Sequence, residues 1–165
     1  MNRSVMKKII MILMAIFALG LQNVSAQDAP LKIVTNHPDF NIKISRCVAN
    51  GKTVIIDLLL INEGTNDVED LYVGGGHNGS EAYDNEGNIY VNGLKVKIAN
   101  RPEYSPSQSN FNIPTGVPMK LSISIDGVPQ SAESIARLKI NIVCRAWGID
   151  SNKPVRISNI PITRD

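Results

Sequence analysis

Apolar and polar residues alternate along several stretches of this chain, and the clearest alternation runs from Val117 to Asp126. Every second residue there is apolar, ending with Ile123 and Ile125, and the residues between them are mostly polar. Successive side chains of a β-strand point to opposite faces, so a period of two predicts a strand with one buried and one solvated face. A shift of one residue would expose the whole apolar set, so the pattern also specifies the register.

The segment from Thr53 to Ile61 is different because it is apolar on both faces, with Asp57 as its only charged residue. A strand of this kind is typical of the middle of a sheet that is covered on each side. We therefore expect residues 53–61 to form a covered central strand, which ends at the turn-forming residues 62–67.

Weaker alternation predicts further strands on both sides of these two. Their approximate limits are 40–48, 68–73, 81–83, 88–91, 94–98, 138–144 and 155–160. Asp84 and Gly87 bracket a four-residue turn, a composition typical of a hairpin that closes with a left-handed glycine. Residues 100–112 have no apolar period and are expected to form a loop, and residues 131–136 are expected to form one helical turn.

The number and spacing of these segments favour one fold class. Seven to nine short strands follow one another with turn signals between them, and no helical segment of 10 to 15 residues separates them. This pattern argues for an antiparallel sandwich or barrel rather than for alternating helices and strands. We predict an all-β protein with an immunoglobulin-like antiparallel β-sandwich.

The N-terminal segment, from Met1 to Ala26, has the composition of a secretory signal peptide. Basic residues precede an apolar run from Ile9 to Leu21, and residues 24–26 (VSA) supply the small side chains that signal peptidase reads. The apolar run is shorter than the roughly 20 residues that span a bilayer as a helix. We expect cleavage after Ala26, which leaves residues 27–165 as one domain that is secreted or periplasmic. Retention as an uncleaved anchor is the alternative.

The net charge changes when this leader is set aside. The full sequence has 17 Lys and Arg residues and 15 Asp and Glu residues. The leader contains three of the bases (Arg3, Lys7 and Lys8) and none of the acids, so residues 27–165 carry 14 bases and 15 acids, a net charge of −1. We therefore predict no nucleic-acid partner, no polybasic membrane patch and no stable membrane insertion of the mature chain.

Four segments follow one another in an order that carries a family resemblance. Residues 40–44 (FNIKI) lead into the long apolar strand that ends at residues 60–64 (LINEG), the hairpin at residues 84–87 follows, and residues 113–118 (IPTGVP) introduce the alternating strand. Over about residues 38–145 the chain resembles small secreted bacterial immunoglobulin-like domains, including the mycobacterial immunoprotective extracellular antigen type. The resemblance implies a β-sandwich without a known enzymatic activity, and it supplies no catalytic residues.

Cys47 and Cys144 are the two cysteines of the chain. An oxidising compartment would allow a disulfide between them, and two buried free thiols are the alternative. Antibody domains pack a Trp against their disulfide and place a Tyr two residues before the second Cys. Here Trp147 follows the second cysteine and Ile142 stands at the position of that Tyr. The sequence leaves the disulfide open.

Residues 74–79 contain the spacing G-x-G-x-x-G, which in dinucleotide-binding proteins opens a helix that holds the pyrophosphate. A predicted hairpin follows here instead, so we interpret the segment as a connection between strands and expect no cofactor. His77 in this segment and His37 are too isolated for a zinc site, which needs three or four ligands. The carboxylates around Asp67 and Asp84 lack the spacing of an EF-hand calcium loop, and we expect no metal.

Aromatic side chains in or beside predicted loops are the remaining candidates for a binding site. Together with one histidine they are Tyr72, His77, Tyr83, Tyr104 and Trp147. Exposed aromatics often anchor interfaces, so the first hypothesis is a binding module that recognises a protein or a glycan at the cell envelope. The second is a structural or accessory subunit that pairs through a sheet edge. We expect no enzyme, because the chain has no G-x-S-x-G elbow.

Overall fold

Twelve β-strands and no helix make up the regular structure of the part of the chain that the computed structural model describes, residues 29–74, 79–101, 111–144, 149 and 153–164. In chain order they are β1 (Lys32–Val34), β2 (Phe40–Asn50), β3 (Thr53–Asn62), β4 (Val68–Gly74), β5 (Glu81–Asp84), β6 (Ile89–Tyr90), β7 (Leu94–Ile98), β8 (Phe111–Ile113), β9 (Met119–Asp126), β10 (Ser134–Val143), β11 (Val155–Pro161) and β12 (Thr163–Arg164). The all-β prediction is confirmed. The strand count exceeds the predicted seven to nine because β1, β8 and β12 have only two or three residues each, too few for an alternation to be recognised. The expected signal peptide lies outside the described residues.

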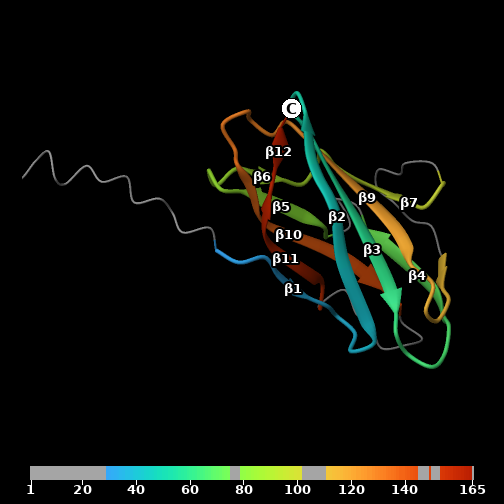
Figure 1. Ribbon diagram of the computed structural model, residues 1–165. Helices are drawn as coiled ribbons and strands as arrows, with labels where there is room; N and C mark the ends of the chain where they lie inside the picture. The colour runs from blue at the N-terminus through green and yellow to red at the C-terminus, as the bar shows by residue number, and fades with distance from the viewer. Residues whose placement is uncertain (1–28, 75–78, 102–110, 145–148, 150–152, 165) are drawn as a thin grey trace, which may run out of the picture.

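The strands form two sheets that face each other (Figure 1). One has five strands in the order β12-β2-β3-β9-β7, and the other has seven, with β1-β11-β10-β4-β8 as its path and β5 paired to both β10 and β6. The order β2-β3-β9-β7 opposite β4-β10-β11 is that of strands A-B-E-D opposite C-F-G in constant-type immunoglobulin domains. The immunoglobulin-like sandwich is therefore confirmed. Pairing is antiparallel between all described strands except β12, which lies parallel to β2.

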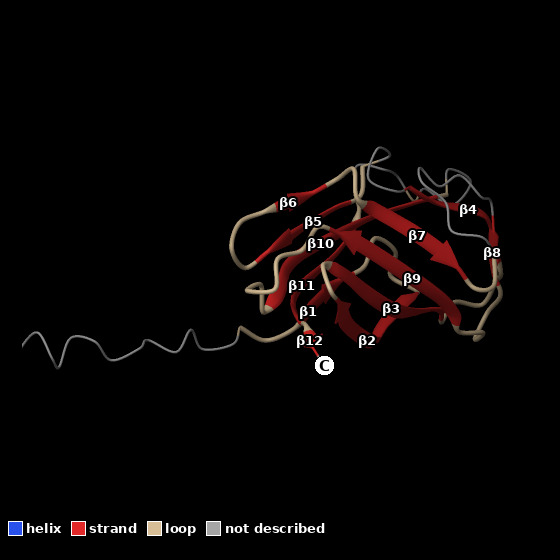
Figure 2. Cartoon of the chain, turned by 90° about the horizontal axis from the view of Figure 1, so that it is seen from above, coloured by secondary structure: helices blue, strands red, loops and turns tan. Residues whose placement is uncertain are grey.

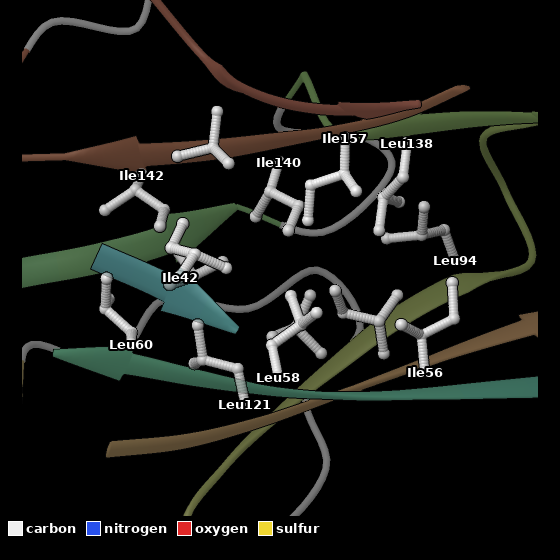
Figure 3. Close-up of a cluster of buried hydrophobic side chains, with 14 of the residues drawn as sticks. Ile42, Ile56, Leu58, Leu60, Leu94, Leu121, Leu138, Ile140, Ile142 and Ile157 are labelled. Atoms are coloured by element: carbon white, nitrogen blue, oxygen red, sulfur yellow. The ribbon is translucent and has the colours of Figure 1, made fainter. Parts of the chain in front are cut away.

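The core lies between the two sheets and consists mainly of aliphatic side chains (Figure 3). Ile56 and Leu58 of β3 and Leu121 of β9 point inward from the five-stranded sheet, and Leu138 and Ile140 of β10 meet them from the other. The buried apolar residues form one continuous cluster. The alternation predicted in β9 and β10 therefore selects the correct faces.

Strand β2 departs from its predicted alternation at one point. The pairing with β3 runs Ile44↔Leu58 and then Arg46↔Asp57, so Ser45 is an extra residue and forms a β-bulge. The bulge moves every later side chain of β2 to the opposite face. Cys47 consequently enters the core. Val48, expected on the same face as Ile44, lies only half-buried on the other side of the sheet.

Two further predictions about local structure were wrong. Val117 is not in β9, which begins at Met119; its N–H donates to Pro114 O within a turn at Gly116 (φ +73°), and its side chain is 47% exposed. Residues 131–136 form no helical turn among the described residues, because Ser134 already belongs to β10 and pairs with β11. Pairing with a neighbouring strand satisfies the backbone groups there in place of helical hydrogen bonds.

The hairpin predicted at residues 84–87 is confirmed as the connection between β5 and β6. Gly87 has a φ of +87°, the left-handed conformation that the predicted turn requires. The Asp84 carboxylate accepts hydrogen bonds from the N–H groups of Glu86 and Asn88, which holds the turn closed.

Candidate functional site

Four strands of the five-stranded sheet, β2, β3, β9 and β7, lie side by side (Figure 2), and three of them, β2, β9 and β7, place basic residues on the outward-facing side. Inward positions of these strands are mainly aliphatic, so their charged residues project to the outside. The bases on this side are Lys43, Arg46, Lys95, Lys97 and Lys120, and we call it the basic face. Among the described residues of these strands only two acids, Asp57 and Asp126, share it, so the strands themselves place three excess positive charges on the face, and Glu63, which accepts from the Asn41 side chain, lies at its edge just beyond β3.

Asp57 occupies the centre of the basic face and is almost fully covered by its partners. Arg46 donates to Asp57 Oδ2 from Nη2 at 2.8 Å and from Nε at 3.0 Å. Lys120 Nζ lies 3.4 Å from the same oxygen, and the hydroxyl of Ser122 donates to Oδ1. Burial raises the pKa of this carboxyl, but the Ser122 hydrogen bond and the charges of Arg46 and Lys120 outweigh it and leave the pKa below its usual range. Asp57 is therefore ionised at neutral pH.

The remaining bases are less engaged. Lys95 Nζ lies 3.4 Å from Asp126 Oδ2 in a pair that is exposed to solvent. Within the described residues, Lys43 and Lys97 have no acidic side chain within ion-pair distance. Lys97 stands at the end of the row that crosses Arg46, Asp57 and Ser122. The uncompensated positive charge of the face therefore lies on both sides of Asp57.

An aliphatic row runs through the middle of the basic face. Ile55, Leu59 and Ile61 of β3 point outward and are half-buried. The prediction that β3 is covered on both sides was wrong: one side faces the core, and the other is shielded only in part. Long basic side chains stand on both sides of this row, since Leu59 pairs with Lys43 on β2 and with Lys120 on β9. Their methylene stems can cover aliphatic side chains while their charged ends stay in water.

The aromatic candidates are not brought together in the part of the chain that the structure describes. Tyr72 and Tyr83 are half-buried on the outer side of the seven-stranded sheet, where they pair with Val143 and Arg137 of β10. Six residues along a strand separate these positions, a distance of about 20 Å. His77, Tyr104 and Trp147 lie outside the described residues. A shared aromatic anchor site therefore stays a prediction.

The glycine-rich segment joins two strands, as predicted. It begins at the last residue of β4 and ends shortly before β5, and these two strands pair with successive parts of β10; residues 75–78 lie outside the described residues. Ser80, at the end of the segment, is buried, donates to Gly74 O and accepts from Asn141 N–H at 2.9 Å. This hydroxyl fastens the start of β5 to β10, which is a structural role.

The carboxylates of Asp67 and Asp84 are engaged by the protein and lie apart. Asp67 accepts from Thr115 N–H at 2.8 Å, whereas Asp84 accepts from the hydroxyl of Tyr90 and from Asn88. No group of three or more His, Cys, Asp or Glu side chains in the described ranges is placed to hold a metal ion. The same ranges contain no helix with the length and apolar character needed to cross a bilayer.

The disulfide between Cys47 and Cys144 is not formed, and both residues are buried free thiols. They belong to different sheets: Cys47 lies in β2, whereas Cys144 directly follows β10 and donates from Sγ to Glu69 O at 3.1 Å. Burial raises the pKa of the Cys47 thiol to about 11, although the nearby charge of Arg164 opposes this effect. The bulge in β2 explains why Cys47 points into the core.

Comparison with known proteins identifies no family for this chain. No family model matches the chain, and no curated protein does. The resemblance to secreted mycobacterial-type domains therefore stays a prediction. Among solved structures, the chain is similar to a family 123 glycoside hydrolase from Clostridium perfringens, studied for glycolipid glycan hydrolysis, with 11% identity and a TM-score of 0.40. The match covers 82% of this chain and 26% of that one, and a similarity this low carries no inference about activity.

The basic face was missed from the sequence although its residues were visible there. In three of the predicted strands the outward positions include lysine, namely Lys43, Lys95, Lys97 and Lys120. The prediction of no basic patch depended on the net charge, which sums over all surfaces. Only the strand order brings these alternate positions to one side of one sheet.

Proposed function

We propose that this protein is an exported binding module, secreted or periplasmic after cleavage at Ala26, that holds an anionic partner at the cell envelope on its basic face. The observation that supports the proposal is the excess of five bases over two acids on one side of a single sheet. Residues 27–165 have a net charge of −1. The acids that balance these bases must therefore lie elsewhere on the molecule.

Several of those acids gather at one end of the sandwich, in the loops and strand ends around the end of β3 and the start of β4. They are Asp39, Glu63, Asp67, Glu69 and Asp70. Charges that serve only solubility are usually interspersed in sign over a surface. Separation into a basic face and an acidic end favours an oriented interaction with a charged partner.

The alternative function, assembly through a sheet edge, has less support. Among the described strands, β7 is an edge of the five-stranded sheet and pairs with β9 alone. Lys95 and Lys97 place charged side chains along this edge, a feature with which natural sheets prevent pairing with another chain. We therefore place the interaction on the face rather than on the edge, and the proposal includes no catalytic step.

The proposal is tested with the full chain, expressed with its leader and purified after export. Intact mass first determines whether the segment from Met1 to Ala26 has been removed. Envelope material is then separated into protein, glycan and lipid fractions, and the retention of each by the immobilised protein is quantified. The charge-reversed variant Lys43→Glu/Lys97→Glu is compared with the wild type. These two lysines are chosen because neither forms an ion pair with an acidic side chain among the described residues, so their replacement breaks no such pair.

The matched control is Lys32→Glu/Lys153→Glu, which makes the same change in charge at exposed positions on and beside strands of the seven-stranded sheet. We expect one fraction to bind the wild type and the control and to be lost by the basic-face variant. Equal retention by both variants, or no retained fraction, would contradict the proposal.

A further inference from the structure

The spacing of charges on the basic face constrains the partner. Lys43 and Lys120 stand on either side of Leu59, two strand spacings or about 10 Å apart, and Arg46 and Lys97 are three spacings or about 14 Å apart. The bases therefore surround a central region and do not converge on one point. A partner that contacts all of them must present several anionic groups at separations comparable to these.

The centre of the basic face is unsuited to binding a single small anion. Asp57 is ionised there and already engages Arg46 and Lys120. An anion placed between these two bases would lie beside the Asp57 carboxylate, and like charges at this distance repel each other. The available attraction comes instead from Lys43 and Lys97 at the two sides of the face.

The aliphatic row adds a second requirement. Ile55, Leu59 and Ile61 are partly exposed between the bases, so a fully hydrated polymer such as a polysaccharide would leave this apolar surface without a partner. The interface of a bilayer offers both elements, because anionic headgroups lie above the acyl boundary. Lysine side chains at such an interface reach the headgroups while their stems remain in apolar surroundings.

We propose that the basic face binds the surface of a bilayer that contains anionic phospholipids. This inference rests on the proposed function, and it names the partner of the same face. Each base near an anionic surface strengthens association by about fivefold. The three excess charges therefore give a weak, reversible attachment that weakens as salt is added, because salt screens exposed charges.

The test measures co-sedimentation of the full chain, processed on export, with vesicles of phosphatidylglycerol mixed into phosphatidylcholine. We expect binding that grows with the phosphatidylglycerol fraction, disappears on pure phosphatidylcholine and decreases as salt is added. Lys43→Glu/Lys97→Glu should weaken binding by at least about 25-fold, whereas Lys32→Glu/Lys153→Glu should retain most of it. Equal losses in the two variants would overturn the inference, because attraction would then follow net charge alone.

The variant Asp57→Asn should strengthen vesicle binding, whereas the lysine variants weaken it. It removes the central negative charge and keeps all five bases, so vesicle binding should strengthen by about fivefold. Circular dichroism and urea unfolding test whether each variant is folded. If Asp57→Asn does not fold, Lys97→Gln replaces it, and its binding to vesicles should weaken by about fivefold.

Two outcomes separate this inference from the proposed function. If wild type and control retain a protein or glycan fraction that the basic-face variant loses, but no variant binds anionic vesicles, the proposed function stands and the bilayer inference is overturned. Binding to soluble polyphosphate with the same dependence on Lys43 and Lys97, without vesicle binding, would likewise overturn it in favour of a soluble polyanion.

Discussion

The phenolic hydroxyl of Tyr90 donates a 2.6 Å hydrogen bond to Oδ2 of Asp84, across the hairpin that joins β5 and β6. The same oxygen accepts from the side chain of Asn88, and both Asp84 and Tyr90 are buried. Burial raises the pKa of the Asp84 carboxyl, but the hydrogen bonds from Tyr90 and Asn88 outweigh it and lower the pKa below its usual range. Burial, together with this carboxylate, raises the pKa of Tyr90. The pair is therefore a carboxylate and a neutral phenol at neutral pH.

Removal of this hydroxyl should destabilise the protein. Tyr90→Phe keeps the ring in place but removes one of the hydrogen-bond donors to the buried Asp84 carboxylate, so we expect the free energy of unfolding at neutral pH to fall by about 1.5–3 kcal/mol. Urea unfolding followed by circular dichroism measures the change. A loss below about 0.5 kcal/mol, the lower limit for an ordinary hydrogen bond, would show that this one contributes little.

The lowered pKa of Asp84 predicts how stability depends on pH. A carboxyl whose pKa is lower in the folded state stabilises the fold above its unfolded pKa, about 3.9, and this contribution is lost as the pH falls through the folded value. When the free energy of unfolding is measured between pH 7 and pH 2, it should therefore decrease once the pH is below about 4. The fall should be shallower in Asp84→Asn, although not absent, because the pKa of Asp57 is also lowered. Identical slopes in wild type and variant would contradict this assignment.

Two adjacent leucines of β3 test the register of the sandwich. Leu58 is fully buried between the sheets, whereas Leu59 points outward on the basic face. We expect Leu58→Ala to lower the free energy of unfolding by about 2–5 kcal/mol, because it leaves a cavity in the core. Leu59→Ala should cost less than about 1.5 kcal/mol, since its side chain is only half-buried. Chemical denaturation of both variants compares the values directly, and a larger cost at Leu59 would mean that the register is wrong.

The buried thiols should react only after unfolding. Cys47 is 8% exposed and its pKa is raised to about 11, and Cys144 is 1% exposed. The reactive thiolate of Cys47 is therefore both scarce and shielded in the native state, and Cys144 is shielded by burial. Iodoacetamide at pH 8 should leave the native mass unchanged and add two adducts when guanidinium is present. A native mass lower by two hydrogens, with no adducts after unfolding, would instead indicate a disulfide.

Arg164 should contribute to stability although it lies in a strand of two residues. Its Nη2 donates to Pro129 O at 2.8 Å and to Ala132 O at 2.9 Å, which ties β12 to the connection between β9 and β10. We expect Arg164→Ala to lower the free energy of unfolding by about 1–3 kcal/mol. Arg137→Ala, at an exposed position of β10, should change it by less than about 0.5 kcal/mol. The same urea experiment applies, and equal effects at the two positions would contradict the role of Arg164.

The sequence predicted those parts of the fold that depend on local alternation. Leu121 and Ile123 of β9 point inward as their spacing requires, and the hairpin closed by Gly87 forms where its composition placed it. The environment of Val48 could not be predicted in this way, because the bulge at Ser45 depends on how β2 pairs with β3. Pairing between distant segments is not encoded in the period of either one.

The candidate site was less predictable than the fold for the same reason. Tyr72 and Tyr83 were singled out as aromatic residues near predicted loops, yet β10 holds them about 20 Å apart. Lys43 and Lys97 give no signal of a site in the sequence, since each is an ordinary exposed lysine in its own strand. Their relationship exists only through the strand order β2-β3-β9-β7, which places segments that are distant in the sequence on one surface.

The extra residue Ser45 links the interior of the protein to its charged surface. If Ser45 instead paired regularly with Asp57, the side chain at position 46 would turn inward and the one at position 47 outward, so a guanidinium would replace a thiol in the apolar interior and Asp57 would lose two of its hydrogen bonds. Loss of the bulge, with Ser45 retained, would therefore damage folding and recognition together. Substitutions at the outward lysines, by contrast, leave the interior untouched, so such surfaces are free to diverge in sequence while the scaffold beneath them is retained.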